Sequence, residues 1–249
     1  VKIGRNDRRP EISQMQNSVD FGVPAADFFL MDTRLIITLD GSHTLYVPGM
    51  DEHYHSRFGA MTESEHIFIN AGLNTIPPGE VSILEVGFGT GLNALLTAVH
   101  SARRKLRATY TSLEKEPVDQ ALISRLNYGS LAGEGGQELF DAIHAAPWNS
   151  PSVITEWFTI EKRVTDLIAE DPAGIYDLVY FDAFGPDKQP EMWKPDMISK
   201  IAALTRPGSV FVTYSAKGNL KRMLRSLGFD VTHLPGPPGK RVFTRAVRK

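Results

Sequence analysis

The fold is decided by the stretch Val81-Ser-Ile-Leu-Glu-Val-Gly-Phe-Gly-Thr-Gly-Leu-Asn93, in which an apolar run leads into closely spaced glycines. The apolar run at residues 81–86 predicts a short strand, and residues 92–100 predict a helix. Glycines between them allow a tight turn and let a ligand approach the backbone, while the start of a helix offers unpaired N–H groups. The stretch therefore predicts a strand, a ligand-binding turn and a helix.

The alternation of strands and helices continues toward the C-terminus. Further β-rich runs predict strands at residues 108–113, 157–160, 176–181, 209–214, 230–234 and 242–246. The runs between them predict helices at residues 117–126, 165–169, 192–204 and 220–227, and the glycine-rich residues 127–136 predict an irregular segment. Strands that alternate with helices are typical of a mostly parallel sheet. We therefore expect a Rossmann-like α/β fold with a seven-stranded sheet and with ligands beyond the carboxyl ends of its strands.

The region before this alternation is expected to be a small addition, residues 1–75, to a main domain at residues 76–249. A chain of 249 residues is long enough for one catalytic unit and too short for two large domains. Residues 1–30 show no clear period and predict a loosely ordered arm or a peripheral helix.

Two kinds of local pattern are recognisable within this addition. The runs at residues 34–39 and 43–47 flank the turn dipeptide Asp40-Gly41 and predict a hairpin. A helical pattern begins near Glu63 and ends at Gly72. The addition is therefore expected to contain a hairpin followed by a helix.

Composition excludes several classes of protein. The chain has no cysteine, which excludes disulfides, thiolate catalysis and cysteine-ligated zinc. No apolar run approaches the ~20 residues that span a bilayer, so no membrane partner is expected. The first ten residues are charged and lack the apolar core of a secretion signal, which favours a cytoplasmic protein.

Charge is unevenly distributed along the chain. The formal net charge of -2 argues against strong overall attraction to nucleic acid. From Lys217 to Lys249, however, basic residues far outnumber the one acid, Asp230. Two interpretations stay open for this C-terminal region: an ordinary solvated surface, or a patch that contacts phosphates.

The glycine turn favours S-adenosylmethionine as its ligand. A dinucleotide fold would place the third glycine one position later, at Leu92. Here an acid, Glu85, precedes the turn, and an acid suits the ammonium and sulfonium of S-adenosylmethionine better than it suits a phosphate. Glu114 follows the next predicted strand, where a carboxylate can accept both ribose hydroxyls. The expected cofactor-binding residues are Glu85, Gly87, Gly89, Gly91, Asn93, Glu114 and Asp166.

Asp166 has two possible roles. It follows the predicted strand at residues 157–160 and could contact the amine of the adenine. It also precedes a short predicted helix, and aspartate is a preferred N-cap residue. The helix cap is the favoured interpretation.

A second constellation runs from Tyr180 to Trp193, where a buried strand leads into a loop. A carboxylate at this strand end, Asp182, would face the methyl group of the cofactor. Methyl transfer is an in-line displacement, so the protein must align the nucleophile and remove its charge. A carboxylate can hold an amine and accept its proton, and Phe184 and Trp193 can stack on a flat base. Core packing is the competing interpretation for Trp193.

These motifs resemble a known family. They are Glu85-Val-Gly-Phe-Gly-Thr-Gly-Leu-Asn93, the loop from Asp182 to Trp193, Tyr214-Ser-Ala-Lys-Gly218, Pro235-Gly-Pro-Pro-Gly-Lys-Arg241 and Asp51-Glu-His-Tyr-His-Ser56. Over residues 33–247 the chain is similar to the methyltransferases that complete 5-methylaminomethyl-2-thiouridine at the tRNA wobble position.

The resemblance implies a class I methyltransferase fold and a specific reaction. A methyl group would pass from S-adenosylmethionine to the primary amine of 5-aminomethyluridine in tRNA, with Asp182 at the reacting amine. The matching motifs imply that Tyr54, Ser56, Lys240 and Arg241 join Phe184 and Trp193 as substrate-binding residues. Many members are fused to a flavin-dependent oxidoreductase that makes the amine. For this chain we expect a separate enzyme to supply the aminomethyl group.

Histidines near the N-terminal motif raise the alternative of a metal site. His53 and His55 alternate along the chain, and Glu63 and His66 follow nearby. Spacing places no third ligand beside the two histidines, so no metal is expected. We expect these histidines to shape the substrate entrance instead.

Other functions stay open at the level of sequence. Within enzymes, the acceptor could be another nucleic-acid position, a protein amine or a polyamine that receives an aminopropyl group, because fold alone does not separate these reactions. From another class, the chain could be a non-catalytic RNA-binding module. The basic C-terminal region favours tRNA, and the acids Glu85, Glu114 and Asp182 favour an enzyme.

Overall fold

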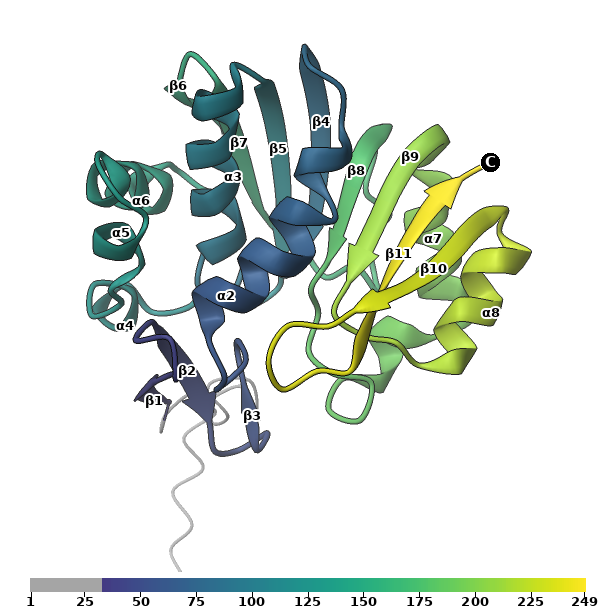
Figure 1. Ribbon diagram of the computed structural model, residues 1–249, viewed down its shortest axis with the longest axis horizontal. Helices are drawn as coiled ribbons and strands as arrows, with labels where there is room; N and C mark the ends of the chain where they lie inside the picture. Colours follow the sequence, from purple (N-terminus) through teal and green to yellow (C-terminus); the bar gives the residue numbers. More distant parts are fainter. Residues whose placement is uncertain (1–32) are drawn as a thin grey trace, which may run out of the picture.

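The computed structural model describes residues 33–249, and its main element is an eight-stranded sheet (Figure 1). The spatial order is β10 (Phe229–Pro235), β11 (Val242–Arg248), β9 (Thr205–Thr213), β8 (Tyr176–Phe181), β4 (Glu80–Val86), β5 (Arg107–Glu114), β7 (Phe158–Val164) and β6 (Pro151–Thr155). The five central strands, from β9 to β7, are mutually parallel, and the pairings β6–β7, β9–β11 and β10–β11 are antiparallel. The expected mostly parallel α/β sheet is confirmed.

The expected number of strands was wrong by one, because β6 carries no clear sequence signal. It begins at Pro151, pairs with β7 on one side only and shifts register after Val153. Val153 is 76% exposed. An edge strand with one partner has no need of the apolar alternation that reveals a covered strand.

Helices cover both faces of the sheet (Figure 1). One face carries α3 (Leu92–Arg104), α5 (Tyr128–Leu131) and α6 (Gly136–Ala145), and the other carries α7 (Pro195–Ala203) and α8 (Gly218–Ser226). Alternate residues of β8 enter the two cores: Leu178 and Tyr180 pack on the α3 side, Val179 and Phe181 on the α7 side. A strand covered on both faces needs an apolar residue at nearly every position, which explains its continuous apolar sequence.

Several helices differ from the sequence-based expectations. Only α4 (Gln120–Ile123) forms within residues 117–126, and it begins after Asp119, whose carboxylate accepts a hydrogen bond from the Ala121 N–H at 2.7 Å. The segment 127–136, expected to be irregular, contains α5 and the first residue of α6. Glycines lower the intrinsic helix propensity of this segment, and packing against the core overrides it.

Two further helices were placed wrongly. Residues 165–169 form a turn rather than a helix, closed by a hydrogen bond from the Ala169 N–H to the Asp166 carbonyl at 2.9 Å. Residues 192–204 do not form one helix: a short 3-10 helix, Pro190–Trp193, precedes α7. Pro195 is the first residue of α7, because proline is accepted in the first turn of a helix but not in its interior.

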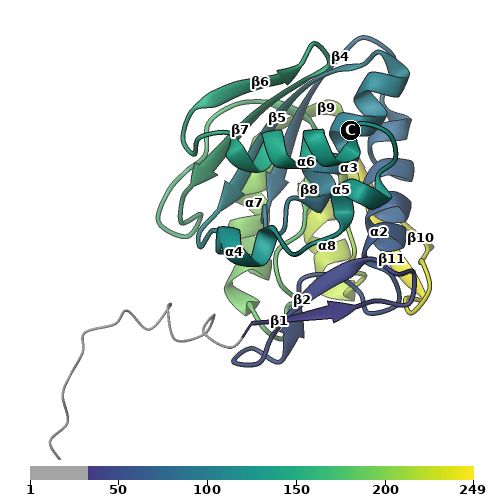
Figure 2. The ribbon, with the colours of Figure 1, turned by 90° about the vertical axis from the view of Figure 1, so that its left-hand side faces the viewer.

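The strands of the N-terminal addition lie at the carboxyl edge of the main sheet, and its helical part packs on the face that carries α3 (Figures 1 and 2). It contains the expected hairpin of β1 (Arg34–Ile37) and β2 (His43–Val47), extended by a third short strand, β3 (Glu52–His53). The chain continues into α2 (Ala60–Ser64), a wider π-helix (Glu65–Asn70) and a 3-10 turn (Leu73–Thr75). The expected arm at residues 1–30 lies outside the described residues. Among residues 33–249, no helix is both long and apolar enough to cross a membrane.

Candidate active site

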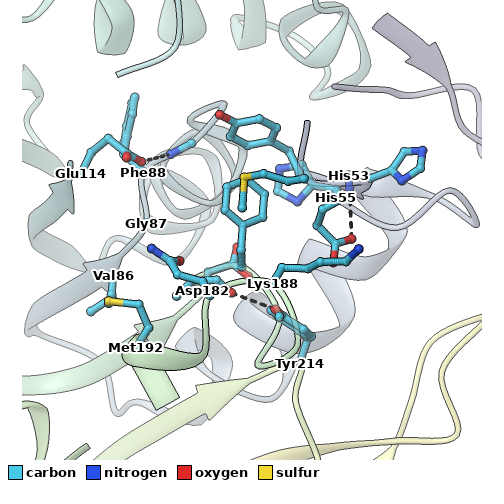
Figure 3. A pocket seen from close by; sticks show the side chains of 18 of the residues that line it. His53, His55, Val86, Gly87, Phe88, Glu114, Asp182, Lys188, Met192 and Tyr214 are labelled. Atoms are coloured by element: carbon cyan, nitrogen blue, oxygen red, sulfur yellow. Dashed lines mark hydrogen bonds between the residues drawn. The ribbon is translucent and has the colours of Figure 1, made fainter. Parts of the chain in front are cut away.

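The carboxyl ends of β4, β5 and β8, together with the loop after β3, surround a cavity of about 1060 Å³ (Figure 3). The chain passes from β4 to β5 on one side, and β8 adds on the other side of β4, so the cavity lies where the strand order switches. Open α/β sheets bind their ligands at this position. Pockets for a single small ligand span roughly 300–1,000 Å³. This cavity is large enough to hold a cofactor and an acceptor side by side.

The glycine turn after β4 brings two strand ends into contact. Gly87 has a φ of +91°, and a Cβ atom there would lie 2.8 Å from the carbonyl oxygen of Asp182. The Gly87 N–H donates to the Leu113 carbonyl at 2.8 Å, and the Asp182 N–H donates to the Val86 carbonyl at 2.9 Å. Only glycine combines this backbone conformation with so close an approach. The turn therefore holds Asp182 directly beside the cavity floor.

Glu114, at the end of β5, is tied to the same turn. Its carboxylate accepts hydrogen bonds from the Gly89 N–H at 2.9 Å and from the Glu116 N–H at 3.0 Å. Burial raises the pKa of Glu114. The side chain lines the cavity, so an acidic group stands at the glycine end.

Glu85, Gly91 and Asn93 lie behind the cavity wall and are not among the residues that line it. Glu85 is 0% exposed and accepts a hydrogen bond from the Ser112 hydroxyl at 2.5 Å. Burial raises the pKa of Glu85 to about 8. Asn93 donates from Nδ2 to Oδ2 of Asp182 at 2.8 Å. These residues support the wall from behind, whereas Gly87 and Gly89 form part of it.

Asp182 is the most strongly perturbed carboxylate on the cavity wall. Its pKa is raised to about 7, first by burial and second by the negative charge of Glu63. The hydrogen bond from Asn93 and the charge of Lys240 act in the opposite direction. A carboxylate with a pKa near neutrality can accept a proton and release it again under ordinary conditions.

Of the six expected substrate-binding residues, four line the cavity and two do not. Tyr54, Ser56, Phe184 and Lys240 line the cavity, and the rings of Tyr54 and Phe184 meet edge to face with their centroids 5.1 Å apart. Trp193 does not line it. This tryptophan is 5% exposed, packs against Phe181 at 5.0 Å between ring centroids and donates from Nε1 to the Phe184 carbonyl at 2.7 Å. Its geometry is that of a core residue that supports the Phe184 loop.

Arg241 also lies off the cavity wall. Its side chain is exposed on the loop between β10 and β11, next to Lys240. Its guanidinium is exposed to solvent beside a residue of the cavity wall.

Asp166 lines the cavity and also caps a turn. Its carboxylate accepts a hydrogen bond from the Ile168 N–H at 2.9 Å and pairs with Lys115 at 2.9 Å. Leu167 and Ile168 line the same end of the cavity. These two apolar residues offer a surface for a flat ring. Their role was not evident from the sequence, because residues 165–169 were expected to form a helix.

Met192 and Tyr214 are further wall residues, to which the sequence motifs that contain them assigned no role. Tyr214 directly follows β9, the strand that pairs with β8. Position at the carboxyl end of a neighbouring strand was the available signal, the same signal that identified Asp182.

The histidines of the N-terminal motif have separate partners. His55 shares a hydrogen bond of 2.9 Å with the Thr90 hydroxyl, and His66 one of 2.8 Å with the Pro235 carbonyl. The ring of His53 packs on Tyr46, with centroids 4.7 Å apart. Within the described part of the chain, no three histidine, aspartate or glutamate side chains cluster as metal ligands.

The glycine end of the cavity fits S-adenosylmethionine. Glu114, Glu116 and Asp166 line it, and its one lysine, Lys115, is already paired with Asp166. An acidic end suits an ammonium and a sulfonium and disfavours a pyrophosphate. The apolar Leu167 and Ile168 complete a surface on which an adenine ring can lie.

Sequence comparisons also indicate an enzyme that uses S-adenosylmethionine. Residues 159–249 match a family model described as S-adenosyl-L-methionine-dependent methyltransferase. The chain is 32% identical over 213 residues to the tRNA 5-methylaminomethyl-2-thiouridine biosynthesis bifunctional protein MnmC of Ralstonia nicotianae, with 79% of this chain and 32% of the relative covered. The MnmC protein of Cupriavidus metallidurans is 32% identical over 231 residues, with 85% of this chain and 33% of the relative covered. The chain thus spans about a third of the length of these relatives.

Solved structures of other proteins have a similar fold. MNMC2 from Aquifex aeolicus superposes with a TM-score of 0.70 at 27% identity, over 87% of this chain and 70% of that one. Spermidine synthase from Thermotoga maritima superposes with a TM-score of 0.54 at 9% identity, over 87% of this chain and 68% of that one, which shows a shared fold. From its fold, its glycine turn and these relatives, the chain is an S-adenosyl-L-methionine-dependent methyltransferase related to the MnmC methyltransferase domain.

Proposed function

We propose that this protein transfers a methyl group to the primary amine of 5-aminomethyluridine, or its 2-thio form, at the wobble position of tRNA. The product would be the 5-methylaminomethyl nucleoside after which its relatives are named. The observation that carries the proposal is the position of Asp182, a carboxylate with a raised pKa at the point where the glycine turn meets the rest of the cavity.

The reaction requires a neutral amine aligned with the methyl donor. S-adenosylmethionine, when bound, supplies an electrophilic methyl group. Asp182 accepts a hydrogen bond from the amine, takes the proton that the ammonium must lose, and holds the nitrogen lone pair in line. Asn93 fixes the direction of the carboxylate through its hydrogen bond to Oδ2. The half-buried position of Asp182 on the cavity wall raises its pKa close enough to neutrality for this exchange.

Two groups of residues would hold the two ligands. We assign the cofactor to the wall residues Gly87, Gly89, Glu114 and Asp166, with Glu85, Gly91 and Asn93 supporting the turn from behind. The uridine would lie against Tyr54, Ser56 and Phe184, with Trp193 supporting the Phe184 loop. Lys240 and Arg241 would meet tRNA phosphates at the mouth. A separate reaction must first supply the aminomethyl group.

One observation favours a second candidate, transfer to a small cationic amine. The cavity is lined by eight carboxylates and by four lysine or arginine side chains. An acidic wall attracts a polyamine or another free amine as well as it attracts an aminomethyl group. This candidate differs from the first in its acceptor and, for a polyamine, in the group transferred.

The deciding experiment supplies labelled S-adenosylmethionine and bulk tRNA that lacks the final methyl group, and analyses the nucleosides of the product. We expect label in 5-methylaminomethyluridine or its 2-thio form. Label in free polyamines or protein amines, offered in parallel, would replace the tRNA assignment with the second candidate. Cofactor binding without label in any acceptor would contradict both, and absence of cofactor binding would favour a non-catalytic RNA-binding module.

A further inference from the structure

The end of the cavity opposite the glycine turn already holds an ammonium group. The Nζ atom of Lys240 lies 3.3 Å from Oε1 of Glu63 and 4.5 Å from the centroid of the Tyr214 ring. All three side chains line the same cavity as Asp182. In Figure 3, Asp182 lies between the Glu114 side of the cavity and Tyr214. A carboxylate and an aromatic face together make a binding site for a primary ammonium.

Glu63 and Tyr214 are held firmly in place. Oε2 of Glu63 accepts a hydrogen bond from the Ser56 N–H at 2.9 Å, and the Glu63 side chain is 9% exposed. The Tyr214 hydroxyl donates to the Ala183 carbonyl at 2.8 Å, which ties the ring to the residue after Asp182. A buried carboxylate is costly unless a cation or hydrogen bonds satisfy it. Oε1 of Glu63 has no hydrogen-bond donor other than the ammonium that faces it, so a positive partner stabilises the pair.

Lys240, in contrast, reaches this position from outside. It lies on the loop between β10 and β11, and its side chain is 29% exposed. The base of the loop is closed by a hydrogen bond from the Gly236 N–H to the Arg241 carbonyl at 3.0 Å. The long lysine side chain can leave the cavity by rotation about its own bonds while the loop stays in place.

The charges of this pair act on the reacting carboxylate. The negative charge of Glu63 raises the pKa of Asp182, and the positive charge of Lys240 lowers it. The ammonium of Lys240 and the carboxylate of Asp182 line the same cavity, so an acceptor amine that meets Asp182 enters the field of this pair.

We propose that Glu63 and Tyr214 form the subsite for the ammonium of the acceptor, and that Lys240 occupies this subsite until the acceptor replaces it. The inference rests on the proposed function, because it concerns the amine that Asp182 deprotonates. On replacement, the acceptor ammonium takes the contacts with Glu63 and Tyr214 and then passes one proton to Asp182. Lys240 is released toward the exposed Arg241, where both can meet phosphates of the incoming tRNA. An acceptor without an amine does not displace it.

The first test measures the accessibility of Lys240 in the unaltered protein. Acetylation by an N-hydroxysuccinimide ester is followed by peptide mass spectrometry, without ligand, with uridine and with 5-aminomethyluridine. We expect 5-aminomethyluridine to increase labelling of Lys240 several-fold, and uridine to leave it unchanged. Lys105, at the far end of α3 from the glycine turn, serves as the internal reference for reagent consumption. Unchanged labelling of Lys240 at saturating 5-aminomethyluridine would overturn the inference.

The second test uses the nucleoside alone, which has no phosphate, so that only the amine subsite is probed. Lys240→Met should bind 5-aminomethyluridine roughly tenfold more tightly than the wild type, and Glu63→Gln roughly tenfold more weakly. The matched control Lys105→Met should not change the affinity. With tRNA as acceptor, Glu63→Gln should raise KM more than it lowers kcat. Equal nucleoside affinity in the wild type and Lys240→Met would refute the exchange.

The two proposals fail in different ways. Label in tRNA together with unresponsive Lys240 and Glu63 variants would leave the proposed function standing and remove the ammonium subsite. The expected responses to 5-aminomethyluridine without label in tRNA would leave the subsite standing and remove the wobble-uridine assignment.

Discussion

The two ends of the cavity are built in different ways. The glycine end is built around one continuous segment, the turn after β4, with acids that follow the two adjacent strands: Glu114 after β5 and Asp166 after β7. The acceptor end comes from side chains that are far apart in the sequence: Glu63 on α2, Tyr214 after β9 and Lys240 between β10 and β11. Asp182 lies at the boundary between the two ends.

This difference separates the part of the site that recognises a common cofactor from the part that recognises one particular acceptor. A backbone turn with a nearby acid binds the same cofactor in many enzymes. A short sequence motif is therefore enough to predict this part of the site. The acceptor end must match one substrate, and its residues meet only through packing. Variants in the two ends should therefore have separable effects on cofactor affinity and acceptor use.

The largest expected effect belongs to the boundary residue. Asp182→Asn should lower turnover by roughly 10²–10⁴-fold, because an amide cannot accept the amine proton, while cofactor affinity stays near that of the wild type. Single-turnover methyl transfer and calorimetric cofactor binding measure the two quantities. Asp196→Asn, an exposed change in the first turn of α7, is the matched control. Full turnover by Asp182→Asn would disprove the role of Asp182 as base.

The pH dependence of the wild type should come from the same residue. The pKa of Asp182 is about 7, and the base acts only when deprotonated, so kcat/KM should fall roughly tenfold per pH unit below that value. Activity rises as the pH increases through 7 and then levels off. The measurement is kcat/KM for tRNA between pH 5.5 and 8.5, buffered at constant ionic strength. A profile that stays level down to pH 5.5 would be incompatible with this assignment.

A change at the glycine end should affect the cofactor first. Glu114→Gln removes a carboxylate that can accept both ribose hydroxyls, and we expect roughly tenfold weaker cofactor binding with nearly normal turnover at saturation. Glu138→Gln, an exposed change on α6, is the control. Normal cofactor affinity in Glu114→Gln together with weakened acceptor binding would reverse the assignment of the two ends.

The smallest expected effect is at the mouth of the acceptor end. For tRNA that carries the aminomethyl group, the double variant Lys240→Met and Arg241→Met should lower the slope of log affinity against log salt by roughly 1.4–1.8, if each residue meets one phosphate. Binding is measured at several salt concentrations, with Lys105→Met as the control. An unchanged salt slope would place the tRNA-binding face elsewhere on the molecule.

The parts of the fold that were predicted correctly are mostly those with a clear local sequence pattern. The apolar run of β8 and the strand–turn–helix of β4 and α3 were recognised because a covered strand and an amphipathic helix need particular residues at particular intervals. The edge strand β6 and the glycine-containing α5 were missed, because contacts with the rest of the molecule stabilise them against weak local preferences.

The sequence by itself determined the glycine turn, the acid after β5 and a carboxylate at the end of β8, because each follows from a short segment and its strand context. Only the tertiary structure decided that Glu85 and Asn93 lie behind the wall, that Trp193 packs in the core, and that Glu63, Tyr214 and Lys240 meet. It also decided the raised pKa of Asp182. The physical reason is that burial and long-range contacts depend on how distant segments pack, and neither is encoded in residue spacing.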